Sequence, residues 1–376
     1  MRSSSEKKLI ILVIIVVVII LAIAGFIAYA FLSNGNNASQ NDMNFMMYNE
    51  ETSRTPVVTG NNITQNTVVA VENVEGNQSQ TPVSNTTDTS KYYYNQLSDT
   101  AKKIYDKLKE HKEDMKTGTY EIDFGTEFNN VLNTKDGEKI LNEEYQSAWN
   151  AFSYDNVDLF YLDISKISMT IEARTEGGTT TYYVKIGPGN YSSYLSSTFA
   201  NKQEIEDAEA YIEDIRNQVI SILGPYDNAM KIKVVNEWII DNLTYEDREG
   251  NNNKYNLYGA IVETRVVCEG YSRMFKYIMD GLNIPCILVS GTATNSESQT
   301  ELHAWNYVEL NGQWYAIDVT WNDPVIVGGG EPTDSQKSKY LLKGKNFLED
   351  HEEDGMISEN SMEFTFPTLN NADYIF

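Results

Sequence analysis

The chain has 376 residues, of which 41% are hydrophobic and 11% aromatic, enough apolar material for one large domain or two smaller ones. It carries 29 Lys and Arg against 54 Asp and Glu, a formal net charge of −25. Because binding to a phosphate backbone depends on Lys and Arg, this balance argues against a nucleic-acid partner. The composition excludes a disordered chain and indicates a globular protein whose acidity serves solubility or a cationic partner.

An apolar run without a charged side chain occupies residues 9–32, and three basic residues precede it. This length suits a transmembrane helix, and the basic flank predicts that residues 1–8 are cytoplasmic. A cleavable signal peptide is the alternative, since the run contains an A-x-A pattern, but its apolar region would be shorter. We therefore expect a single-pass anchor in the cell membrane, with the remainder of the chain extracellular.

Residues 33–90 are rich in Ser, Thr, Asn and Gln and contain few aromatic side chains. Such a composition cannot bury enough apolar surface to fold. We expect a disordered linker that holds the following residues away from the membrane.

Residues 91–225 predict a smaller region of mixed helix and strand. A helix is expected to begin at Ser98 or Asp99, and alternating residues on both sides of the turn RTEGGT predict a β-hairpin. A second, acidic helix over residues 201–223 ends before Gly224 and Pro225. The region shows no catalytic pattern, so we expect it to support the rest of the fold or to shape a substrate site.

Cys268 is one of two cysteines, and a clear helical pattern follows it. The apolar positions recur at helical spacing, and Gly281 and Pro285 end the pattern. They are Tyr271, Met274, Phe275, Ile278, Met279 and Leu282. Cys268 is thus expected at the start of a core helix, where free N–H groups and the positive end of the helix dipole favour a thiolate and could stabilise an oxyanion.

A thiolate needs a base, and the chain has three histidines. His111 lies in a charged helix, and His351 lies in the acidic run LEDHEEDG, which we expect to be solvated. His303 lies in a predicted strand that a two-residue Asn-Gly turn joins to a second strand. That turn pairs Trp305 with Asp318, which makes His303 and Asp318 diagonal neighbours within reach of a hydrogen bond.

The same register divides the hairpin into two faces. We expect a core face with Asn306 as its polar exception, and an opposite face that carries the site. The core face comprises Leu302, Ala304, Val308, Leu310, Tyr315, Ile317 and Val319, and the opposite face comprises His303, Trp305, Asp318 and Thr320. Trp321 is expected to point to the core side, whereas Trp305 either excludes water beside the imidazole or packs the sheet.

The segments at residues 266–291 and 301–324 resemble the transglutaminase-like superfamily, in the form found in many bacterial secreted or membrane-anchored proteins. This resemblance implies a papain-related α+β fold over residues 226–376, with a catalytic triad of Cys268, His303 and Asp318. It implies no cofactor, and the calcium-loop pattern is absent from the sequence, so we expect no metal. Cys286 is expected to be inert core.

Two functions remain open on the sequence. The first is a membrane-anchored cysteine enzyme that attacks a carboxamide or peptide carbonyl of a protein or peptide at the cell surface. An amine that resolves the thioester gives a cross-link, and water gives hydrolysis. The second is a non-catalytic adhesion or scaffold module that retains the fold.

Overall fold

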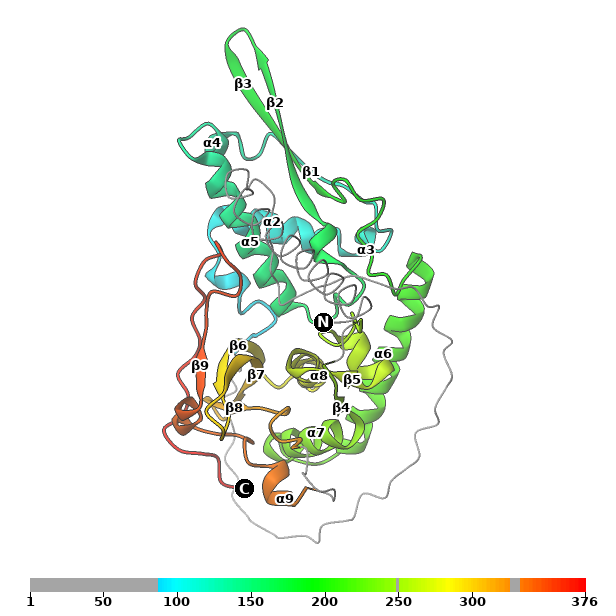
Figure 1. The fold of residues 1–376 in the computed structure, drawn as a ribbon, viewed down its shortest axis with the longest axis vertical. Coiled ribbons are helices and arrows are strands. Elements are labelled where there is room, and N and C mark those ends of the chain that lie inside the picture. The colour runs from blue at the N-terminus through cyan, green and yellow to red at the C-terminus, as the bar shows by residue number, and fades with distance from the viewer. Residues whose placement is uncertain (1–86, 248–249, 325–331) are drawn as a thin grey trace, which may run out of the picture. The chain divides into compact units, whose positions relative to one another are not determined.

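The computed structural model describes residues 87–247, 250–324 and 332–376, which all fall within one compact unit (Figure 1). The predictions for residues 1–8, for the transmembrane helix at residues 9–32 and for most of the linker lie outside these residues. No helix within the described ranges is long and apolar enough to cross a membrane.

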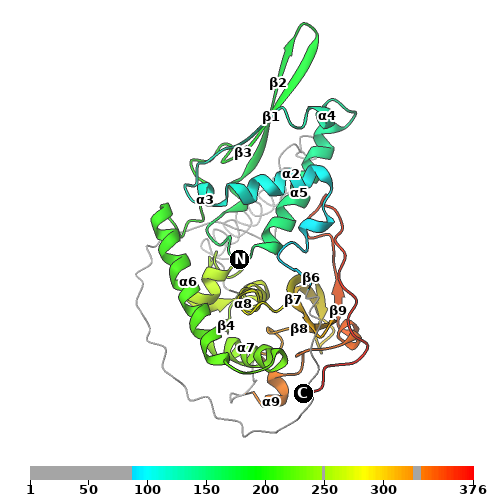
Figure 2. The same ribbon diagram turned by 180° about the vertical axis from the view of Figure 1, so that it is seen from behind.

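The amino-terminal half of the described chain combines helices with a three-stranded sheet. The helices are α2 (Asp99–Glu110), α3 (Lys112–Met115), α4 (Asn129–Leu132), α5 (Gly137–Asp155) and α6 (Lys202–Leu223), with short 3₁₀ turns at Tyr94–Gln96 and Ile164–Lys166. The strands are β1 (Ile122–Gly125), β2 (Ser168–Glu176) and β3 (Thr179–Gly187). They pair antiparallel in the order β1-β3-β2. In Figures 1 and 2 the β2–β3 hairpin projects away from the helices.

Local sequence signals set the boundaries of these elements. Ser98 caps α2 by accepting a hydrogen bond from the backbone N–H of Ala101, and Asn201 caps α6 in the same way. The expected hairpin is confirmed, since Glu176 pairs with Thr179 across the two-glycine turn.

The carboxyl-terminal half holds a helix between further helices and a four-stranded sheet. Its helices are α7 (Asn228–Asn242), a π-helical turn (Gly259–Glu263), α8 (Cys268–Gly281), α9 (Asp334–Lys337) and a 3₁₀ turn (Lys345–Glu349). Its strands are β4 (Thr244–Tyr245), β5 (Arg265–Val266), β6 (Cys286–Thr294), β7 (Thr300–Leu310), β8 (Gln313–Ile317) and β9 (His351–Glu353). The four-stranded antiparallel sheet has the order β8-β7-β6-β9, and β4 pairs with β5 in parallel.

Helix α8 is the central element of this half. Both ribbon views show it between α6 and α7 on one side and the sheet on the other (Figures 1 and 2). Tyr271, Phe275 and Met279 on its apolar stripe have no exposed surface. The helical pattern expected after Cys268 is therefore confirmed, and the helix is held in place from both sides.

The two faces of the β7–β8 hairpin differ from the sequence expectation. Val308, Ile317 and Val319 face the main core as expected, but Leu302 is 63% exposed. The opposite face is also buried, because the carboxyl-terminal segment covers it and forms a second apolar cluster. That cluster comprises Ile287, Val289, Trp305, Tyr307, Ala316, Tyr340, Phe347 and Leu369.

Hydrogen bonds fix this covering segment, residues 340–376, to the sheet. Lys343 exchanges backbone hydrogen bonds with Ala316, and the backbone of Asn370 donates to Trp314. Although residues 354–376 contain almost no regular secondary structure, their backbone is anchored to strands formed much earlier in the chain.

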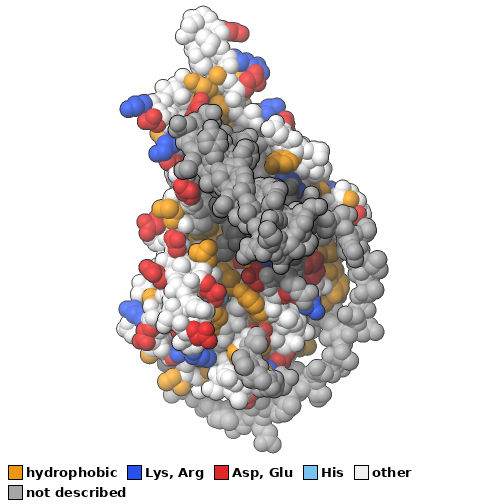
Figure 3. Space-filling model, in the orientation of Figure 1, with side chains coloured by type: hydrophobic (Ala, Val, Ile, Leu, Met, Phe, Trp, Pro, Cys, Tyr) orange, Lys and Arg blue, Asp and Glu red, His pale blue; other side chains and the backbone are white. Residues whose placement is uncertain are grey.

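Acidic and basic side chains are interspersed on the face of the described residues seen in Figure 3. Many of them form short-range ion pairs on single helices, such as Lys107 with Glu110. Such exposed pairs contribute little to stability. The excess of acidic residues therefore affects the surface charge of the protein more than the stability of its fold.

Candidate active site

Cys268 is the first residue of α8 and is 6% exposed. The preceding residue, Val267, makes no side-chain cap, so no side chain competes at that position for the first N–H groups of the helix. Cys286 lies at the start of β6 with no exposed surface, and both cysteines are free thiols. Cys268 therefore keeps a slight exposure to solvent, whereas Cys286 has none.

The β7–β8 hairpin has the register expected from its two-residue turn. Asn306 pairs with Ile317 and Leu310 pairs with Gln313. Strand β8 ends at Ile317, and the next residue, Asp318, places Oδ2 2.8 Å from Nε2 of His303. Both side chains are buried, His303 at 2% and Asp318 at 0% exposure.

The thiol of Cys268 completes this group from α8. It lies close enough to the His303 imidazole to raise the pKa of that ring, so helix and sheet meet at the imidazole. The structure thus brings together all three residues that the sequence singled out. His111, by contrast, pairs with Asp114 at 2.9 Å near the end of α2 and takes no part in the group.

The imidazole of His303 and the carboxylate of Asp318 stabilise each other's charged forms. Burial disfavours a charged imidazole, but the carboxylate of Asp318, its hydrogen bond and the contact with Cys268 outweigh burial and raise the pKa of His303 to about 10. Burial also works against the carboxylate, yet the two histidines near it hold the pKa of Asp318 well below its ordinary value. The arrangement can accept a proton from the thiol on an imidazole whose orientation the carboxylate fixes.

His351 belongs to the same cluster, which the sequence analysis did not anticipate. Its Nε2 lies 3.2 Å from Oδ2 of Asp318, and its Nδ1 lies 2.7 Å from Oδ1 of Asp350. The prediction of a solvated acidic run is wrong at this position, since His351 is 2% exposed. The reason is that β9 pairs with β6. This pairing places His351 opposite Ala293 and brings its ring into the buried cluster.

His303, Asp318 and His351 offer ligand atoms that all lie within 4.8 Å of one another, close enough to hold a metal ion. The same atoms are already joined by hydrogen bonds at 2.8 and 3.2 Å. Hydrogen bonding among buried groups is sufficient to explain why they lie so close together.

Two tryptophans lie beside the imidazole. The ring centroid of Trp305 is 6.1 Å from that of His303, and Trp305 is fully buried in the second apolar cluster. The ring centroid of Trp321 is nearer, at 5.3 Å, so the expectation that it points away to the core is wrong. Residues 318–322 form a turn, in which the N–H of Trp321 donates to Asp318 Oδ1 at 3.0 Å, and strand alternation does not extend to them.

Tyrosines line the side of α8 near the thiol. Tyr245 is 43% exposed, and it lies close enough to Cys268 and Glu301 for their charges to act on its hydroxyl. Its ring centroid is 6.5 Å from that of Tyr271, whose hydroxyl donates to Asp323 Oδ2 at 2.7 Å. Tyr245 is therefore a surface aromatic near the nucleophile, while Tyr271 links α8 to the turn after β8.

A buried thiol at a helix start, beside an imidazole that a carboxylate orients, is the arrangement that a cysteine nucleophile requires. Residues 217–319 match the model of the transglutaminase-like superfamily. The resemblance seen in the sequence is thereby confirmed for the core, and the mixed α/β content of the structure is consistent with it.

Similar proteins span several activities. The kyphoscoliosis peptidase of Mus musculus is 21% identical over 40% of this chain and 25% of its own length, so the chain spans about a quarter of that relative. Among solved structures, a TGase has a TM-score of 0.28 at 14% identity, covering 47% of this chain and 50% of its own. An arylamine N-acetyltransferase from Bacillus cereus has a TM-score of 0.23 at 15% identity, covering 29% of this chain and 49% of its own.

Proposed function

We propose that the protein is a cysteine enzyme that attacks a carboxamide or peptide carbonyl and forms a thioester on Cys268. One observation carries this proposal: the thiol at the start of α8 lies close to the imidazole of His303, whose Nε2 lies 2.8 Å from Oδ2 of Asp318. These are the three roles of nucleophile, general base and orienting carboxylate in one connected group.

The sequence of proton movements follows from this geometry. His303, with a pKa raised to about 10, holds the proton taken from Cys268 before the sulfur attacks the carbonyl carbon, and then gives that proton to the departing amine or ammonia. The N–H groups at the start of α8 have no side-chain cap, so they are available to stabilise the charge that develops on the carbonyl oxygen. An amine that attacks the thioester yields a cross-link, and water yields a carboxylate.

The location of the enzyme is part of the proposal. Residues 9–32 anchor the chain in the cell membrane, and the described residues act on proteins or peptides outside the cell. An impermeant protease added to intact cells then releases a fragment that begins within residues 33–90. If the protease releases no fragment from cells whose surface is accessible, the orientation is the reverse of the one proposed.

Incubation of the chain with a labelled primary amine and a glutamine-containing protein tests the reaction. Incorporation of the amine identifies a transferase, and release of new termini or ammonia without incorporation identifies a hydrolase. Both products disappear in Cys268→Ser. A product that persists in Cys268→Ser contradicts the assignment of the nucleophile.

A non-catalytic adhesion or scaffold module is the second candidate, and the low exposure of Cys268, 6%, favours it. A module of this kind retains the buried cluster for stability alone. Its thiol then resists alkylation in the native chain, whereas the enzyme's thiol reacts.

A further inference from the structure

His351 meets the proposed triad from outside the matched superfamily region. It lies 33 residues after Asp318, in the short edge strand β9, and reaches Asp318 because β9 pairs with β6. We propose, on the basis of the proposed function, that His351 is a positioning residue that holds the carboxylate of Asp318 in the orientation that serves His303.

The contacts of Asp318 show what His351 supplies. The oxygen Oδ2 accepts from Nε2 of His303 at 2.8 Å and from Nε2 of His351 at 3.2 Å, and Oδ1 accepts from the backbone of Trp321 at 3.0 Å. An ionised carboxylate only accepts hydrogen bonds, so Nε2 of His351 is the donor. With both oxygens engaged from different elements, the carboxylate cannot rotate about its bond without breaking one of these contacts.

His351 is itself held rigidly. Its ring stacks on Phe347 with centroids 3.9 Å apart, and Trp305, Trp321 and Tyr340 lie around it at 4.7 to 5.5 Å. Its Nδ1 lies 2.7 Å from Oδ1 of Asp350, whose Oδ2 accepts from the hydroxyl of Tyr340 at 2.8 Å. The orientation of the ring is therefore determined by packing on its faces and by hydrogen bonds at both nitrogens.

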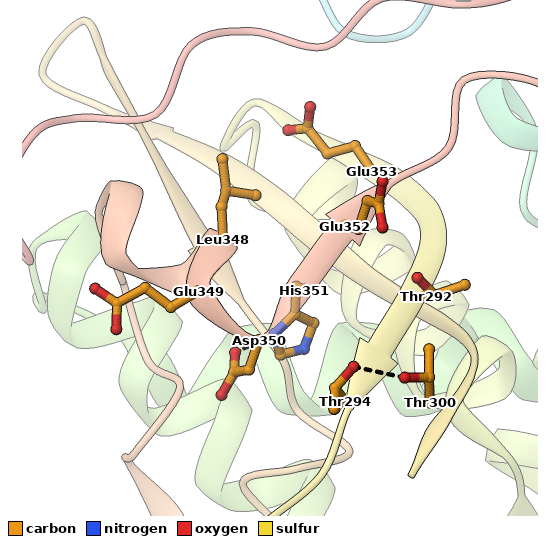
Figure 4. A pocket seen from close by; sticks show the side chains of 9 residues that line it. All are labelled: Thr292, Thr294, Thr300, Leu348, Glu349, Asp350, His351, Glu352 and Glu353. Carbon is orange, nitrogen blue, oxygen red and sulfur yellow. Dashed lines mark hydrogen bonds and ion pairs between the residues drawn. The ribbon is translucent and has the colours of Figure 1, made fainter. Parts of the chain in front are cut away.

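The outer end of this chain of contacts reaches a pocket of about 490 Å³. Figure 4 shows His351 beside Asp350 in its lining, together with Thr292 and Thr294 of β6. The contacts therefore form a series from Cys268 through His303, Asp318 and His351 to Asp350, which lines this pocket.

Removal of the His351 donor leaves Asp318 with fewer partners in a buried site, and an unmet hydrogen bond there is costly. Asp318 can then turn away from His303, and the imidazole takes the thiol proton less readily. We expect the rate of alkylation of Cys268 to fall by roughly tenfold to a hundredfold.

The first test compares two substitutions in the full 376-residue chain, with iodoacetamide alkylation of Cys268 near neutral pH as the measurement. His351→Phe keeps an aromatic ring of similar shape but has no donor, whereas His351→Gln lacks the ring but places an amide N–H near Nε2. Positioning predicts slow alkylation in His351→Phe and a rate within a few-fold of the parent in His351→Gln. The reverse order shows that His351 serves packing and overturns the proposal.

A double-mutant cycle separates action through Asp318 from a general effect on the fold. In the Asp318→Asn background, His351→Phe is expected to cause no further slowing, because the carboxylate that it positions is gone. An equal slowing in both backgrounds overturns the proposal. Melting temperatures are measured throughout, and His351→Leu is the donor-free variant if His351→Phe does not fold.

His111→Gln is the matched control, since it breaks a His–Asp hydrogen bond of 2.9 Å outside the site and should leave alkylation unchanged. The measurement needs no substrate, so it is independent of the reaction proposed above. A chain that passes this test but neither incorporates amine nor cleaves a peptide refutes the proposed function and leaves the positioning role of His351 in place.

Discussion

Asp318 combines complete burial with a carboxyl pKa well below its ordinary value. Burial alone would neutralise the group, so the hydrogen bonds and charges of its neighbours must outweigh the loss of water. A depressed carboxyl pKa contributes stability that is present at neutral pH and is lost as the pH falls through the folded-state value. The ionised form is thus part of the folded structure as well as of the proposed chemistry.

Asp318→Asn is expected to lower the rate of thioester formation by roughly four orders of magnitude, because the amide no longer fixes the imidazole in the productive tautomer. The fold is expected to persist, since the amide has the size of the carboxylate and keeps an oxygen for the N–H of Trp321. Burst kinetics and circular dichroism measure the two effects. Unfolding together with loss of activity shows that Asp318 is needed for structure first.

The two tryptophans beside His303 are expected to respond differently. Trp321 is partly exposed and lies nearer the imidazole, so Trp321→Ala admits water and shifts the partition of the thioester from amine toward hydrolysis. Trp305 is fully buried, so Trp305→Ala lowers the free energy of unfolding by about 3–5 kcal/mol. Product ratios and denaturant titrations measure these outcomes, and an unchanged ratio in Trp321→Ala excludes a shielding role.

The group formed by Cys268, His303 and Asp318 could be predicted because each placement depends on a local pattern. The start of α8 determines the position of the Cys268 thiol. A two-residue turn determines the strand register that brings His303 to Asp318. His351 could not be predicted in this way. Its acidic neighbours indicate solvent, and its partner lies on a strand with no local relation to it. Only the spacing of four residues from Phe347, on which it stacks, hinted at burial.

At the scale of elements, α8 connects the nucleophile to the amino-terminal half. Arg273 donates to the backbone oxygen and to Oγ of Ser153 on α5, both at 3.0 Å. It also pairs with Glu269 on its own helix at 2.8 Å, with both side chains below 10% exposure. The mixed helix and strand region therefore contacts the helix that carries Cys268, one turn after the thiol.

Arg273→Met is expected to lower the free energy of unfolding by roughly 3–5 kcal/mol, because it leaves Glu269 charged and buried without its partner. The double variant Glu269→Gln, Arg273→Met removes that unpaired charge and should recover part of the loss. Urea midpoints measure both. If the double variant loses more stability than the two single variants together, the unpaired charge of Glu269 is not the cause of the loss.

Elements with strong local signals could be predicted from sequence, and the covering segment could not. Helices α2, α6 and α8 have caps or a clear apolar period, which act within a few residues. The residues after β9 have neither, and their apolar side chains are placed by the elements that they cover: Leu369 joins the second apolar cluster on the sheet, and Phe364 joins the main core. That tertiary requirement also explains why both faces of the β7–β8 hairpin are buried.

At the scale of the described molecule, a buried carboxyl group joins the amino-terminal segment to α5. Asp155 accepts from the backbone of Tyr93 and Tyr94, each at 3.0 Å, and from the hydroxyl of Tyr105 at 3.2 Å. Tyr93 in turn donates from its hydroxyl to the backbone oxygen of Leu288 in β6. Burial nevertheless dominates and raises the pKa of Asp155 to about 7.

This raised pKa predicts how stability depends on pH. Between 3.8, the ordinary value, and about 7 the folded chain retains a proton that the unfolded chain releases, so stability falls as the pH rises through this window. The loss amounts to roughly 4 kcal/mol at most for a shift of this size. Free energies of unfolding across the window should fall less steeply in Asp155→Asn than in the parent. Parallel curves contradict the assignment, and exposed Glu138→Gln is the control.

The covering segment also imposes an order in time. The sulfur and the imidazole are synthesised well before residue 351, yet the carboxylate that orients the imidazole gains its second histidine only when β9 has been made and has paired with β6. If His351 positions Asp318 as proposed, a nascent chain that ends just after the β7–β8 hairpin carries all three residues of the triad but lacks the contact that orients the carboxylate. If the thiol acts as proposed, its reactivity is delayed until late in synthesis, and a chain interrupted before that point leaves a weak nucleophile rather than an uncontrolled one.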